Sequence, residues 1–93
     1  MTVDWTEPAR DDLRAIRQYL EQHSPEQADA TVRGLVDHAA RAALFPRSGR
    51  IVPEFGVELI RELIAAPYRI VYEVFPDRVE ILAVFHGAQS FPR

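Results

Sequence analysis

Residues 59–86, LIRELIAAPYRIVYEVFPDRVEILAVFH, constrain the fold most, because they form three short runs with the pattern of consecutive strands. The runs predict strands over residues 57–64, 68–75 and 78–85, in which successive side chains point to opposite faces. The segments AAP and PD separate the runs, and proline suits a tight turn. Regular alternation in the last run would place residues 79, 81, 83 and 85 on one face. Both faces of that run are largely apolar, which predicts a strand covered on both sides.

The first half of the chain predicts two helices. Apolar residues recur at spacings of four, three and four between residues 9 and 20, which indicates one face of a helix, and Thr6 has the character of its N-cap. The segment HSPEQ then predicts a new helix, because Ser24 and Gln27 can form a capping box. FPRSG ends this second helix. Its apolar stripe consists of Ala28, Val32, Leu35, Ala39 and Ala42.

These elements predict one α+β domain over residues 1–93. Residues 2–5 alternate weakly and can form a first strand, so the expected order is β-α-α-β-β-β. The short link between the helices makes them antiparallel neighbours. We therefore expect a helical hairpin packed on one face of a small antiparallel sheet.

The amino-acid composition limits the classes of function that fit this chain. The net charge is -3 and the pI is about 5.5, whereas nucleic-acid binders usually carry a basic excess. The chain has no cysteine, and all of its basic residues are arginine. His23, His38 and His86 are not spaced to share a metal, so neither a metal nor a cofactor is expected. Without an apolar run of about 20 residues or a signal-like start, the sequence predicts a cytoplasmic protein with no membrane partner.

Arg61, Arg69 and His86 are the candidate catalytic residues. If neighbouring strands bring them together, the arginines could stabilise negative charge in a phosphodiester transition state while the histidine moves a proton. The alternative is structural, with Arg69 paired to Glu62 or Glu73 across the sheet. Both interpretations stay open on the sequence alone.

Four segments carry a resemblance to a known family. WTEPARDDLRAIRQYL, FPRSGR, YRIVY and ILAVFH occur in an order that resembles the RelE/ParE superfamily of type II toxin–antitoxin toxins, over nearly the whole chain. The resemblance implies one of two activities. RelE-like members cleave messenger RNA on the ribosome with a basic cluster and a C-terminal tyrosine, and ParE-like members poison DNA gyrase. Arg69 matches the ribonuclease set, but its lysines, its late basic residue and its tyrosine have no counterpart here, so the chain resembles ParE more closely.

The resemblance implies a toxin that a cognate antitoxin neutralises, with DNA gyrase as the expected target and no enzyme activity of its own. One alternative is a ribosome-dependent mRNA endoribonuclease that uses Arg61, Arg69 and His86. Another is an inactive toxin-derived module that only binds a partner.

An antitoxin segment is expected to combine a helix in a groove with strand addition, because unpaired sheet edges accept strands. We expect the groove between the helical hairpin and the sheet face that carries Val71, Phe75 and Phe85. The tail HGAQSFPR, with Phe91 and Arg93 as anchors, is expected to reach the target. The alternative is that the first three residues belong to the core and that the tail is disordered.

Overall fold

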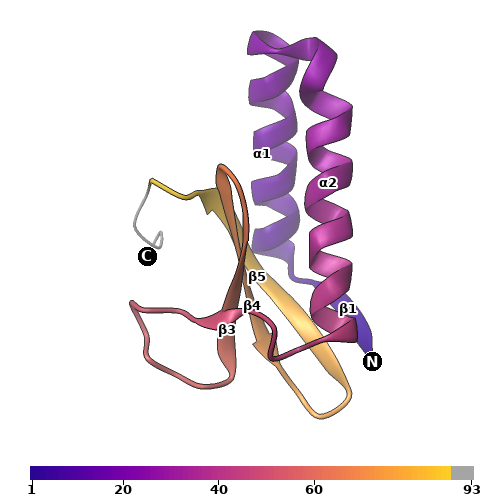
Figure 1. Ribbon diagram of the computed structural model, residues 1–93. Helices are drawn as coiled ribbons and strands as arrows, with labels where there is room; N and C mark the ends of the chain where they lie inside the picture. Colours follow the sequence, from indigo (N-terminus) through magenta and orange to yellow (C-terminus); the bar gives the residue numbers. More distant parts are fainter. Residues whose placement is uncertain (89–93) are drawn as a thin grey trace.

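A computed structural model describes residues 1–88 and shows two helices on one face of a five-stranded sheet (Figure 1). The strand order is β1-β5-β4-β3-β2. The expected α+β fold is confirmed, with an additional short strand between the helices and the three long strands. The elements in chain order are β1 Thr2–Trp5, α1 Glu7–His23, α2 Pro25–Leu44, β2 Arg50–Ile51, β3 Ile60–Ala65, β4 Tyr68–Val74 and β5 Arg78–His86.

The sheet is mixed, whereas the sequence predicted an antiparallel one. β1 pairs with β5 in parallel, with Val3 opposite Val79, and the other strand pairs are antiparallel. The helical hairpin separates β1 from the other strands along the chain. Alternation of side chains defines which face of β1 is apolar, but it carries no information on the direction of its neighbour.

Both helices form where the apolar pattern predicted them, although their caps differ. The Thr6 hydroxyl accepts a hydrogen bond from the Ala9 N–H at 3.3 Å, as an N-cap does. Ser24 makes no side-chain capping bond, so the predicted capping box is wrong. The reason is that Ser24 also ends α1, where its N–H donates to the Leu20 carbonyl at 2.7 Å and sets its backbone geometry.

The helices and the sheet enclose the main core. All five residues of the predicted α2 stripe are buried, and three of them, Leu35, Ala39 and Ala42, join this cluster. Burial of such side chains supplies most of the free energy that holds the two layers together. The sheet contributes the buried residues Ile70, Tyr72, Val79, Ile81 and Val84.

A second, smaller core lies on the sheet face that points away from the helices, and it consists of Val52, Val71, Ala83 and Phe85. The register of β4 and β5 shifts at residue 82, because Val71 pairs with Ala83 whereas Tyr72 pairs with Ile81. The extra residue makes a β-bulge, which moves residues 83 and 85 to the outer face. The regular alternation expected for this strand is therefore wrong beyond Ile81.

β3 begins at Ile60, not at residue 57 as predicted. The Ile60 N–H donates to the Val57 carbonyl at 3.1 Å, so the backbone turns just before the strand. Gly56 takes a positive φ of 64°, which favours glycine and breaks an extended chain. Among residues 1–88, no helix is long and apolar enough to cross a lipid bilayer.

Candidate functional site

Arg69 lies in a buried ionic cluster on the outer face of the sheet. Its side chain projects from β4, and the residue is only 7% exposed. Its Nε donates to Glu62 Oε1 at 2.6 Å, and its two terminal nitrogens donate to the two Glu54 oxygens at 3.0 and 2.9 Å. Arg50 Nε donates to Glu62 Oε2. Glu62 is only 1% exposed. The guanidinium also stacks over the Phe85 ring, 4.9 Å from its centroid.

The cluster fixes the charge of Arg69. Hydrogen bonds with Glu54 raise the pKa of the Arg69 guanidinium, and those with Glu62 add to the shift, although burial opposes it. The cation is therefore permanently charged and neutralised by two carboxylates of the same chain. The structural alternative drawn from the sequence, an Arg69–Glu62 pair, is confirmed.

Arg61 and His86 lie elsewhere and make different contacts. The Arg61 guanidinium donates to the backbone carbonyls of residues 58, 49 and 47, at 2.9, 3.0 and 3.3 Å. His86 is exposed at the end of β5, where its ring meets that of Tyr68 edge-on and its Nδ1 accepts from the Ala88 N–H. Arg61 thus holds the loop between α2 and β3 in place.

The structure does not bring the three candidate catalytic residues together. Arg69 pairs across the ladder with Ile64 and Phe85 on the outer face, so the adjacent His86 points to the helix side. Arg61 also points to the helix side, and its partner on β4 is Tyr72. The partner of His86 on β4 is Tyr68, four residues from Tyr72. That offset alone is about 13 Å along the strand. A catalytic role for the three residues stays a prediction.

The residues expected to bind a partner are also placed differently. Val71 and Phe85 are buried in the outer core, so they do not line a groove with the helices. Phe75 is partly buried under the Arg78 guanidinium, 4.3 Å from its ring centroid. Phe91 and Arg93 lie outside the described residues. Partner binding by these five side chains stays a prediction.

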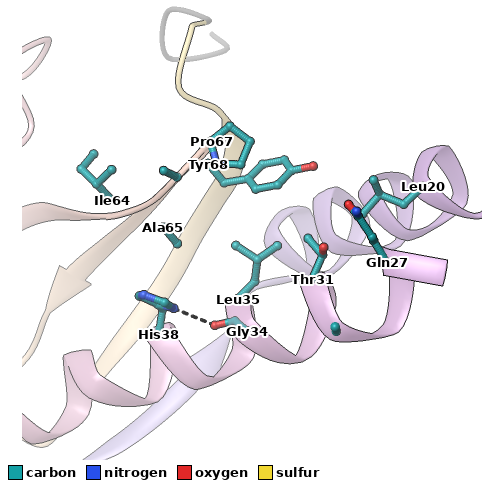
Figure 2. A pocket seen from close by; sticks show the side chains of 12 residues that line it. Leu20, Gln27, Thr31, Gly34, Leu35, His38, Ile64, Ala65, Pro67 and Tyr68 are labelled. Carbon is teal, nitrogen blue, oxygen red and sulfur yellow. Dashed lines mark hydrogen bonds between the residues drawn. The ribbon is translucent and has the colours of Figure 1, made fainter. Parts of the chain in front are cut away.

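A cleft of about 490 Å³ separates α2 from the turn between β3 and β4 (Figure 2). We expected a groove between the helical hairpin and the sheet, but none of the sheet residues expected there lines this cleft, because its lining is set only when the two layers meet. Figure 2 shows Gly34 and His38 on the helix side and the Ala65 side chain pointing toward them, whereas the Ile64 side chain points away from α2. The cleft is lined by Leu20, Gln27, Ala30, Thr31, Gly34, Leu35, His38, Ile64, Ala65, Ala66, Pro67 and Tyr68.

The cleft borders an open sheet edge. β2 pairs only with Arg61 and Glu62, so among the described residues no strand lies beside residues 63–65. The Ile60 carbonyl accepts from the Val52 N–H on the β2 side, whereas the Leu59 carbonyl accepts from Val74 on the β4 side. Backbone groups alternate in direction along a strand, so those of Ile64 point to the open edge. Ile64 is 54% exposed there.

Gly34 is the sequence signal that could have drawn attention to this region. A glycine inside a helix costs roughly 0.5–1 kcal/mol relative to alanine. A Cβ added to Gly34 would meet no atom within 4 Å, so packing among the described residues does not require this glycine. Next to it, His38 Nδ1 donates to the Gly34 carbonyl at 2.8 Å, because a carbonyl oxygen can only accept.

Residues 3–91 match the family model described as ParE toxin of type II toxin-antitoxin system, parDE. The chain belongs to the ParE toxin family. It is therefore the toxin of a type II toxin–antitoxin system. This agrees with the ParE-like resemblance read from its four sequence segments.

Individual relatives carry the names of both branches of the superfamily. The toxin is 36% identical over 88 residues to Toxin RelE2 of Caulobacter vibrioides, a match that spans 94% of this chain and 96% of the relative. The chromosomal ParDE TA system from P. aeruginosa superimposes with a TM-score of 0.76 at 25% identity, covering 92% of this chain and 95% of the other. The RelBE2 toxin–antitoxin complex from Mycobacterium tuberculosis shares the fold, with a TM-score of 0.59 at 23% identity and coverage of 91% and 95%.

Proposed function

We propose that this toxin inhibits DNA gyrase and that a cognate antitoxin holds it inactive. The observation that carries the choice of target is the ionic cluster of Arg69, the one residue that matches the ribonuclease set. Its guanidinium is bound by Glu62 and Glu54, and little of it reaches the surface. A scissile phosphate would have to displace two carboxylates that repel it.

The remaining cationic groups give the ribonuclease alternative little support. Catalysis of phosphodiester cleavage needs donors aimed at the charge that develops in the transition state. Arg61 instead donates to three backbone carbonyls, and it lies on the opposite sheet face from Arg69. The acidic chain also lacks the basic excess that docking on ribosomal RNA rewards. These features favour a protein target such as gyrase.

Two observations support an antitoxin partner. The ParDE structure from P. aeruginosa is that of a chromosomal toxin–antitoxin system, and it shares this fold over nearly its whole length. The cleft beside α2 and the open edge of β3 also provide a surface of the kind that peptide segments use. Coexpression with the neighbouring upstream gene should therefore restore growth, and the two products should copurify.

Inducible expression without the antitoxin tests the target. Gyrase inhibition predicts growth arrest with cleaved, enzyme-linked DNA and an SOS response, whereas ribonuclease action predicts cut messages and arrested translation. His86→Ala is an informative variant, because His86 is exposed and its loss should leave the fold intact. We expect this variant to remain toxic. Loss of toxicity together with loss of message cleavage would support the ribonuclease, and normal growth on induction of the unaltered chain would support an inactive module.

A further inference from the structure

We propose that the toxin docks on DNA gyrase through an exposed apolar surface at the end of α2, centred on Leu44 and Phe45. The proposal rests on the proposed function, because it names the part of the toxin that meets the target. It also states the chemistry of the matching feature on gyrase, which is an apolar side chain flanked by carboxylates.

Leu44 and Phe45 are the two most exposed large apolar residues in the described part of the chain, at 72% and 65%. Together with Met1 and Val74 they line a hollow of about 580 Å³. The backbone of Leu59, a further exposed apolar residue, lies beside this hollow, because its carbonyl accepts from the Val74 N–H at 2.8 Å. These five residues form the end surface. Large apolar side chains gathered on a surface mark an interaction site.

Buried hydrogen bonds hold the loop that follows Phe45. The Tyr72 hydroxyl donates to the Pro46 carbonyl at 2.6 Å and accepts from the Gly49 N–H at 3.1 Å. Gly49 leaves the room for this contact, because a Cβ there would lie 2.6 Å from the hydroxyl oxygen. Arg61 adds hydrogen bonds to the carbonyls of residues 47 and 49. Since the loop is already ordered, docking on the end surface costs little conformational entropy.

Two arginines flank the end surface. Arg41 lies one helical turn before Phe45, whose N–H donates to the Arg41 carbonyl, and no carboxylate among residues 1–88 pairs with its guanidinium. Arg47 lines the hollow itself, and its ion pair with Glu58 is exposed, so this pair contributes little and can be exchanged for another. A partner that carries carboxylates around an apolar side chain would complement both arginines.

A second copy of the toxin fits the end surface less well than a different protein. Two copies would meet through the same surface, because a two-fold interface uses the same patch on both subunits. Arg41 and Arg47 would then approach their own counterparts, and like charges across an interface are unfavourable. Exposed apolar patches on single chains also reach only roughly 300–600 Å², below the about 800 Å² that each partner of a standard complex buries. The end surface is therefore suited to anchor a larger contact with the target.

The end surface is separate from the cleft beside α2. The cleft takes its helix wall from residues 27–38, whereas the hollow begins at Leu44, the last residue of α2. Six residues of helix span about 9 Å. Figure 1 shows the end of α2 beside the N-terminus, away from the turn between β3 and β4. The toxin can therefore present different surfaces to its target and to its antitoxin.

The test measures the toxin concentration that gives half of the maximal effect on purified gyrase, read as blocked supercoiling or as trapped, cleaved DNA. Phe45→Ala should raise this concentration by about 30-fold or more, as expected when a central apolar anchor is lost. Tyr19→Ala is the matched control, because Tyr19 is an aromatic residue on α1 that is 60% exposed and does not line the hollow. Its potency should stay within about twofold of the unaltered toxin.

A charge reversal gives a second variant that leaves the apolar side chains in place. Arg41→Glu should raise the half-maximal concentration by about tenfold and make the effect on gyrase less sensitive to salt, because charges at the rim of an interface speed the encounter with an oppositely charged partner. Arg10→Glu reverses an exposed arginine on α1 and should change the potency by no more than about twofold.

The antitoxin makes the failures distinguishable. If the unaltered toxin has no effect on gyrase, the proposed function itself is wrong. If it acts on gyrase, each variant is titrated by calorimetry with the purified product of the neighbouring upstream gene. A loss of potency in Phe45→Ala or Arg41→Glu, with the antitoxin affinity kept within about twofold, supports the docking proposal. Full potency in both variants, or an equal loss of affinity for the antitoxin, overturns it.

Discussion

Replacing Arg69 by methionine should destabilise the toxin strongly, whatever the target. Glu62 would then remain buried with Arg50 as its ionic partner, and the Arg50 side chain is 59% exposed. Removing one partner of a buried pair typically costs 3–5 kcal/mol, because the other charge is left uncompensated. Because Arg50 still compensates part of that charge, we expect Arg69→Met to lower the free energy of unfolding by about 3 kcal/mol, the lower end of this range.

Thermal and urea denaturation followed by circular dichroism measure this loss. A change of 1 kcal/mol shifts the melting temperature of a domain of this size by about 4–8 °C, so Arg69→Met should melt at least about 12 °C lower. Arg33→Met is the matched control, because Arg33 pairs with Asp29 on the surface of α2 with a side chain that is 77% exposed. It should cost no more than about 0.5 kcal/mol.

A second substitution separates the buried charge from the lost side chain. Glu62→Leu combined with Arg69→Met replaces the pair by apolar groups and should recover most of the stability. The double variant should also remain toxic if Arg69 has only a structural role. The reasoning is refuted if Arg69→Met costs less than about 1 kcal/mol, or if the double variant is no more stable than Arg69→Met alone.

Thr6→Ala should lower the free energy of unfolding, measured by urea denaturation, by about 1–2 kcal/mol, because it removes a side-chain cap. Ser24→Ala should lower it by about 0.5 kcal/mol or less, because the Ser24 side chain makes no capping bond. Equal losses would contradict the assignment of the caps. Tyr72→Phe should cost about 1–3 kcal/mol, because the buried hydroxyl bonds two main-chain groups of the loop after α2; an unchanged midpoint would contradict this. Burial raises the pKa of Asp12, so its ionisation weakens the folded state. Asp12→Asn should therefore stabilise the toxin at neutral pH, with a gain that disappears as the pH falls below that pKa; a gain that grows in acid would show the opposite sign.

Local patterns in the sequence were sufficient for the helices. The α2 stripe from Ala28 to Ala42 is buried as predicted, because a period of 3.6 residues depends only on neighbours along the chain. The capping box predicted at Ser24 is absent. Ser24 is both the C-cap of α1 and the N-cap of α2, and with its φ of -150° and ψ of 63° its side chain makes no capping bond.

Features that depend on distant residues could not be predicted in the same way. The parallel pairing of β1 and the bulge near Leu82 are set by contacts across the sheet, not by local propensity. Neighbouring strands could have brought Arg61, Arg69 and His86 together only if the three side chains shared a face of the sheet. Alternation along each strand places Arg69 on the opposite face from the other two.

The cleft depends entirely on tertiary structure. Its two walls come from residues about 30 positions apart, and the sequence marks them only by Gly34 and by the segment AAP. By contrast, the sequence does offer the Arg69–Glu62 pair as one alternative, because both residues fall on neighbouring predicted strands. Glu54 was not foreseen as its third member, since it lies in an irregular loop.

Reconstitution with purified components tests the central claim most directly. The toxin is incubated with gyrase and plasmid DNA, and in parallel with ribosomes that carry a defined message. We predict blocked supercoiling or trapped, cleaved DNA in the first reaction, and intact message in the second. Efficient cleavage of the message, abolished by His86→Ala, together with unaffected gyrase would contradict the account.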